Sequence, residues 1–185
     1  PPLGGDILLE HLRLSHARTG RIAEDLVRAQ LPPDDQLARL LQIGIVLEQV
    51  VEARAHHHTK SLDEELDEEV ETLLAEAAAE SADHRGRLEA LVDALGVDSV
   101  PFEEIESLVD ARYGQTRPED FDGVLYDQLC NEETAYKFYD DLIEAIVESD
   151  ATFSLDRSAL LETLRAIREE EAEGVSEVTA VMERR

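Results

Sequence analysis

The segment Leu125–Ile146, with the sequence LYDQLCNEETAYKFYDDLIEAI, decides the fold of this chain. Its core-type positions recur at alternating steps of three and four residues, which is typical of the buried stripe of a packed α-helix. The stripe consists of Leu125, Gln128, Glu132, Ala135, Tyr139, Leu142 and Ile146. A carboxylate, Glu132, lies in the middle of this stripe, and a buried carboxylate is costly unless it is protonated, paired or bound to a metal ion. The segment therefore predicts a buried helix with a polar interruption.

Three other segments carry the same helical stripe, and each stripe is broken near its middle by a polar or small residue. Pro and Gly clusters separate the segments, whereas the alternating pattern of β-strands is nearly absent. The four helices are expected from about Asp35 to Lys60, from Ser61 to Leu95, from about Pro118 to Glu148, and from Ser154 or Asp156 onward. In that order, the interruptions are Glu48 in the first helix, Ser81 and His84 in the second, Glu132 in the third, and Glu171 and Gly174 in the fourth. The sequence therefore predicts an all-α, antiparallel four-helix bundle.

A Pro-Pro pair at 32–33 divides the chain into an N-terminal helical arm, residues 1–33, and the bundle, residues 34–185. Within the arm, Asp6–Gln30 is expected to form an extra helix whose acidic and basic residues balance. The arm is either a docking surface, through which the protein would form a homo-oligomer, or a helix packed on its own bundle. Between the second and third bundle helices, Val97–Thr116 is long enough for one crossover from one end of the bundle to the other.

The composition is strongly acidic, with 44 acidic and 17 basic residues and a formal net charge of −27. This charge argues against nucleic acid and anionic membrane surfaces as partners. Only two of the basic residues are lysines, and an acidic surface with little Lys is similar to that of cytoplasmic proteins of halophilic archaea, in which salt screens the self-repulsion. No apolar run approaches the length of a membrane span and no signal peptide is visible, so a cytoplasmic location is expected.

Two further features are expected to be structural. Consecutive side chains on a helix point about 100° apart, so the triplet His56–His58 does not chelate a metal ion as a unit and is interpreted as a solvated helix end. Because Cys130 is the only cysteine, the chain has no internal disulfide and no metal site built from several cysteines. It is expected to be a small packed residue.

The polar interruptions lie near the midpoints of their helices, and near-midpoint positions of an antiparallel bundle meet at a common level. The residues expected to converge in the core are Glu48, His84, Glu132 and Glu171. Carboxylate ligands with one His suit iron or manganese, so the set predicts a site for one or two such ions. In the alternative, no metal ion is bound and the carboxyl groups are protonated, partnered by Tyr136 or Tyr139, or turned to solvent.

The residues around these positions resemble the helices of ferritin-like, rubrerythrin-type di-iron proteins. The segments concerned are LQIGIVLE at 41–48, ESADHRGRLEAL at 80–91, EETAYKFY at 132–139 and IREEEAEGV at 167–175. In that superfamily two helices contribute one Glu each and two contribute a Glu-x-x-His pair each. Glu48 and Glu132 match the two lone glutamates, and His84 and Glu171 each match one member of a pair.

The chain departs from that family at two ligand positions. Ser81 stands where the family has the Glu of one pair, and Gly174 stands where it has the His of the other. Glu80, Glu170 and Glu173 are close in sequence but lie about 100° round their helices, so they would replace the missing ligands only with a local change in helix geometry.

Two functions are consistent with this pattern. In the first, Glu48, His84, Glu132 and Glu171 form a reduced metal site, and the resemblance implies oxygen or peroxide chemistry. In the second, the protein is a non-catalytic bundle that has lost the di-iron centre and acts through interactions of its N-terminal arm. The sequence contains no nucleophile constellation, phosphate-binding glycine loop or basic patch that would indicate another enzyme class.

Overall fold

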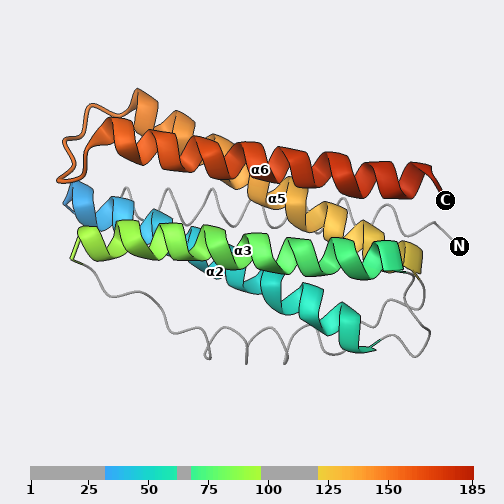
Figure 1. The fold of residues 1–185 in the computed structure, drawn as a ribbon. Coiled ribbons are helices and arrows are strands. Elements are labelled where there is room, and N and C mark those ends of the chain that lie inside the picture. The colour runs from blue at the N-terminus through green and yellow to red at the C-terminus, as the bar shows by residue number, and fades with distance from the viewer. Residues whose placement is uncertain (1–31, 62–67, 97–120) are drawn as a thin grey trace, which may run out of the picture.

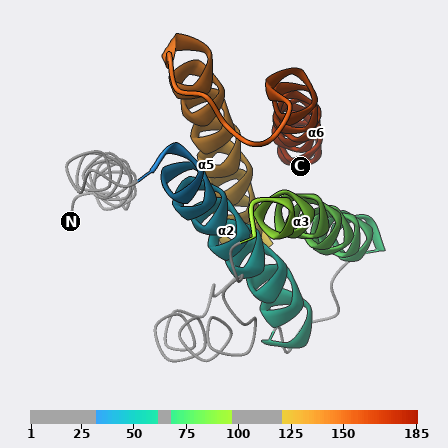
Figure 2. The ribbon, with the colours of Figure 1, turned by 90° about the vertical axis from the view of Figure 1, so that its left-hand side faces the viewer.

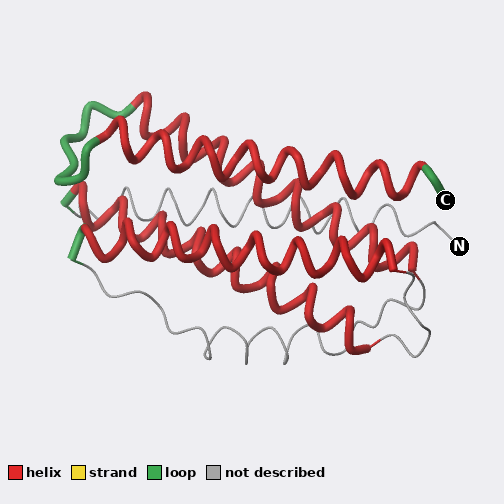
Figure 3. Tube along the Cα trace, viewed as in Figure 1, coloured by secondary structure: helices red, strands yellow, loops and turns green. Residues whose placement is uncertain are grey.

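The computed structural model describes residues 32–61, 68–96 and 121–185, and the described residues form four α-helices with no β-strand (Figures 1 and 3). The helices are α2, Pro33–Ser61; α3, Glu68–Ala94; α5, Phe121–Glu148; and α6, Arg157–Glu183. Each has 27 to 29 residues, which corresponds to a length of roughly 40 Å. None of these helices has an apolar stretch long enough to span a bilayer.

The four helices surround a common core. Helix α2 packs mainly on α3, and α5 packs mainly on α6, while α2 also contacts α5 and α3 also contacts α6 (Figure 2). The Asp34 carboxylate at the start of α2 accepts a hydrogen bond from Ser154 N, 2.9 Å away, in the loop before α6. At the other end of the bundle, Arg184 pairs with Glu69 at the start of α3. The two pairs are antiparallel, as predicted.

The described helices require a long connection between α3 and α5. Helix α3 ends at the end of the bundle where α2 begins, and α5 begins at the opposite end (Figure 1). There His58, near the end of α2, lies 2.7 Å from the Asp127 carboxylate near the start of α5. The ends of α3 and α5 that the predicted crossover would join therefore lie at opposite ends of the bundle. The course of residues 97–120 and the predicted helical arm lie outside the described residues.

The predicted stripes form the core, which a polar layer divides into two apolar clusters. Every residue of the predicted stripes of α2, α5 and α6 is buried. One apolar cluster includes Leu41, Leu88, Leu142 and Leu164. The other, towards the end of α2, consists of Ala55, Val70, Leu73, Leu74, Ala78, Val124, Leu125, Val178 and Val181. Along each helix, the sequence passes from residues of one apolar cluster to residues of the other, and buried polar residues lie in between. All four predicted site residues are among these buried polar residues.

The helix ends confirm some expected signals and correct others. Asp156 is the N-cap of α6, since its carboxylate accepts a hydrogen bond from Ala159 N at 2.8 Å. Gly96 follows α3 with a φ of 74°, a conformation that favours glycine. The prediction that Ser61 opens a helix was wrong, because α2 continues through Ser61 and no Gly or Pro stops it earlier. Asp34 lies inside the first turn of α2 and accepts its hydrogen bond from the loop before α6.

The predicted stripe of α3 drifts at its C-terminal end. Leu91 is only half-buried, whereas Val92 is fully buried. Because the helical period is 3.6 residues, the core-facing side of the helix includes Val92, four residues after Leu88. Leu91, three residues after Leu88, lies at the border between the core-facing and the solvent-facing sides.

Candidate metal centre

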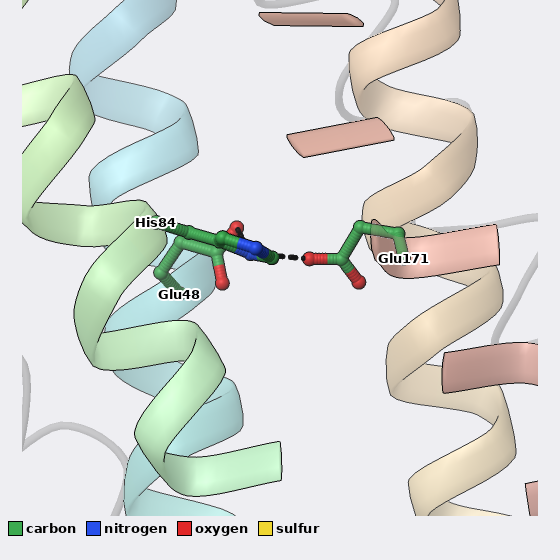
Figure 4. Close-up of side chains that lie close together, drawn as sticks. All are labelled: Glu48, His84 and Glu171. Carbon is green, nitrogen blue, oxygen red and sulfur yellow. Dashed lines mark hydrogen bonds and ion pairs between the residues drawn. The ribbon is translucent and has the colours of Figure 1, made fainter. Parts of the chain in front are cut away.

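The polar layer brings three predicted ligands together from three helices. Glu48 on α2, His84 on α3 and Glu171 on α6 each offer one ligand atom, and these atoms lie within 4.8 Å of one another. Their residues are 0%, 1% and 5% exposed. In Figure 4, Glu48 and His84 extend from one side of the bundle towards Glu171 on the other. Within the part of the chain that the structure describes, this is the only group of three or more His, Cys, Asp or Glu residues with such spacing.

The imidazole of His84 is held from both sides. Its Nδ1 faces the cluster, 2.8 Å from Glu171 Oε1 and 3.7 Å from Glu48 Oε1. Its Nε2 lies 2.7 Å from Glu170 Oε2, and Glu170 is in turn bound by both terminal nitrogens of Arg87. Glu170, expected as an alternative ligand, therefore lies behind the imidazole and not inside the cluster.

Glu48 combines a fixed orientation with an unused ligand atom. The hydroxyl of Tyr139, which is 0% exposed, donates to Glu48 Oε1. Glu48 Oε2 is buried and has no hydrogen-bond partner. A buried carboxylate oxygen normally has a partner, so this atom is free to bind a further donor or a cation.

Glu132 lies beside the three-residue cluster and outside it. Its Oε1 accepts a hydrogen bond from Gln128 Nε2, and a hydrogen bond links its carboxyl group to that of Glu171. The carboxyl group also lies against the backbone of Gly174: a Cβ atom added at Gly174 would be 2.9 Å from Glu132 Cδ and closer still to Oε2. The space beside Gly174 is thus filled by the carboxyl group of Glu132.

The buried groups shift one another's pKa values. Burial raises the pKa of Glu171, and the charges of Glu48 and Glu132 raise it further against the opposing hydrogen bond with His84. Burial likewise raises the pKa of Glu132, although hydrogen bonds with Gln128 and Glu171 oppose the shift. For His84, burial lowers the pKa, but hydrogen bonds with Glu171 and Glu48 outweigh it and raise the pKa to about 11. The cluster thus retains protons at neutral pH when no cation is bound.

The other predicted residues are also placed by the structure. Ser81 is buried on α3, whereas Glu80 and Glu173 are exposed. The expectation that His56–His58 is solvated was wrong for His58, which is 4% exposed and bonds to Asp127. The antiparallel neighbour α5 covers this end of α2, a contact that no pattern within α2 reveals.

Sequence reasoning missed Gln128 and Arg87 as parts of the site. Gln128 lies on the predicted stripe one helical turn before Glu132, and that spacing was a usable signal. Arg87 gave no such signal, because its partner Glu170 lies on another helix.

Comparisons with protein-family models, curated proteins and solved structures found no match for this chain. The function of the site is therefore inferred from its geometry.

The first prediction concerns the contact between Gly174 and Glu132. Gly174→Ala adds a methyl group where the Glu132 carboxyl lies, so we expect it to destabilise the fold by about 1–3 kcal/mol. The matched control is Gly86→Ala, at an exposed helical glycine with no atom within 4 Å of an added Cβ, which should stabilise by up to about 1 kcal/mol. Urea unfolding in constant high salt measures both. Equal effects of the two substitutions would contradict the described packing.

The second prediction concerns pH. The folded-state pKa values of His84, Glu132 and Glu171 all lie above their unfolded values, so the stabilisation they give is present at low pH and lost as pH rises. We expect the unfolding free energy of metal-free protein to fall from pH 6.5 towards about 11, the interval between the unfolded and folded pKa of His84.

Urea unfolding at several pH values, with chelator and constant salt, measures this dependence. Glu171→Gln removes one of the titrating groups without changing its shape, and the curve of this variant should be flatter. A free energy of unfolding that stays constant or rises over the interval in the wild-type protein would refute the assignment.

Proposed function

We propose that this protein binds a divalent metal ion, iron or manganese, in the polar layer of its bundle, as ferritin-like, rubrerythrin-type proteins do. The observation that carries the proposal is the convergence of Glu48, His84 and Glu171 from three helices, together with a buried Glu48 Oε2 that has no hydrogen-bond partner. Oxygen-rich ligands with one imidazole match the preferences of these two metals.

The surroundings of His84 support this assignment. A metal-binding His usually donates its second ring N–H to a carboxylate, which fixes the ring and the nitrogen that binds the metal. Glu170 takes this position at Nε2, and Arg87 holds Glu170 in place. Nδ1 is consequently the atom directed into the cluster, where a metal ion would replace the proton shared with Glu171.

The missing ligands favour one ion over two. Ser81 and Gly174 supply no carboxylate or imidazole, and Glu132 lies against Gly174 with Gln128 bound to it. Glu48, His84 and Glu171 would hold the ion, with the Glu132 carboxyl group adjacent. Bound iron or manganese would supply redox or Lewis-acid chemistry towards oxygen or peroxide. The two apolar clusters exclude water from the layer, and Tyr139 keeps Glu48 oriented.

In a second candidate function, the protein is a non-catalytic helical bundle that binds partners through its N-terminal arm, residues 1–33. The observation that favours it is that both ring nitrogens of His84 lie on carboxylates. A protonated His84 already offsets part of the negative charge of the layer. In this case the polar layer would only specify how the helices pack.

The third prediction separates these two functions. Protein purified in high salt and reconstituted anaerobically with Fe(II) or Mn(II) should retain about one ion per chain by metal analysis. Glu48→Gln and Glu171→Gln should each weaken binding by at least about 10-fold, the usual effect of losing even a supporting residue. Glu133→Gln, on the exposed face of α5, is the control. Folded wild-type protein that retains no ion would leave the non-catalytic bundle as the function.

The fourth prediction tests the positioning of His84. Glu170→Ala removes the partner of Nε2, so we expect metal affinity to fall by about 10–100-fold while saturating stoichiometry is kept. Glu170→Gln retains an acceptor for the ring N–H and should restore part of the affinity. Glu169→Ala, at the neighbouring exposed residue, should have no effect. Competition titrations with a chromophoric chelator measure all three, and equal affinities of the Glu169 and Glu170 variants would exclude this role.

A further inference from the structure

An open groove lies between α3 and α6, towards the start of α3 and the end of α6. It has a volume of about 700 Å³, and the buried side chains of Leu73 and Val181 form part of its floor. Its charged lining residues are Glu68, Glu69, Glu76, Glu177 and Arg184. Four of these five are acidic, so the groove attracts cations.

The acidic lining continues from the groove to the candidate metal centre along both helices. On α3, steps of four residues lead from Glu76 in the groove to Glu80 and then to His84. Residues four apart lie on one face of a helix, one turn from each other. On antiparallel α6, steps of four and three residues lead from Glu177 to Glu173 and Glu170. The two rows end at the hydrogen bond between Glu170 and His84.

Glu80 joins the outer and inner parts of these rows. Its carboxyl group is close enough to interact with the charges of Glu177 and Glu173 on one side and of His84 on the other. Its charge also acts on the buried Glu132. Glu80 is itself exposed, so a cation in the groove reaches this carboxylate without any rearrangement of the core.

Small buried residues lie next to the two rows of glutamates on α3 and α6. Ser81 follows Glu80 on α3, and Gly174 follows Glu173 on α6. The Glu132 carboxyl group lies against Gly174 and bonds to Glu171. Glu132 is thus a buried carboxyl group that interacts both with the charge of Glu80 and with Glu171 in the cluster.

We propose that the α3–α6 groove is the access route for the metal ion, and that Glu80 and Glu177 pass hydrated divalent cations to Glu132 and so to the cluster of Glu48, His84 and Glu171. This inference rests on the proposed metal binding. A solvated acidic face on a protein of charge −27 would also contain glutamates. Such a face does not account for two facing rows that end at the only candidate metal group among the described residues.

Stopped-flow mixing of full-length, metal-free protein with Co(II) chloride tests the route, with visible absorption of bound Co(II) as the signal. In Glu80→Gln/Glu177→Gln we expect loading to be roughly three- to tenfold slower at low salt, and the difference to shrink at high salt, because salt screens steering. The amount of Co(II) bound at equilibrium should not change. Arg184→Gln, which removes a positive charge from the groove, should load faster than the wild type.

The control is Glu144→Gln/Glu162→Gln, which removes the same charge from exposed positions outside the groove. Equal loading rates in the two double variants would overturn the route while leaving metal binding intact. A lower final amount of Co(II) in the groove variant would also overturn it, since Glu80 and Glu177 would then be ligands. Wild-type protein that binds no Co(II) would overturn both the proposed function and the route.

Discussion

Burial of three carboxyl groups and an imidazole in one layer of an apolar bundle is the constraint on which the rest of this structure depends. Unpaired charges in such a place would cost more free energy than a domain of this size has available. The layer offsets the cost by raised pKa values of Glu171 and Glu132, which favour their neutral forms, by protonation of His84, and by hydrogen bonds from Tyr139 and Gln128. Each of these contacts joins different helices or successive turns of one helix, so the register of the bundle is fixed where the polar groups meet.

The same layer limits what the two apolar clusters can do. Each cluster supplies hydrophobic stabilisation on one side of the layer, and neither continues through it. A slip of one helix by one turn would keep most apolar contacts but would separate Glu48 from Tyr139 and His84 from Glu171. We therefore infer that the polar layer helps to specify the register of the helices, while the apolar clusters on its two sides contribute hydrophobic stabilisation.

Helix identity, most of the buried faces and the burial of Glu48, His84, Glu132 and Glu171 could be predicted from the sequence, because burial imposes a period of 3.6 residues that polar residues interrupt visibly. The boundary at Ser61 and the burial of His58 could not, since both depend on packing against a neighbouring helix. The role of Glu170 was also hidden. Its sequence position places it off the core stripe, and only the rotation of α3 relative to α6 shows that it contacts the outer nitrogen of His84.

The two positions that depart from the di-iron pattern acquire a common physical meaning in this fold. Ser81 and Gly174 lie on the neighbouring helices α3 and α6, and both are small and buried. Glu132 occupies the space beside Gly174, where it is bonded to Glu171 and lies within reach of the charge on Glu80. Neither position offers a carboxylate or imidazole that could coordinate a second ion, and both lie on the two helices that form the proposed route for the first ion. A site with only three protein ligands favours exchange of a metal ion over its permanent retention.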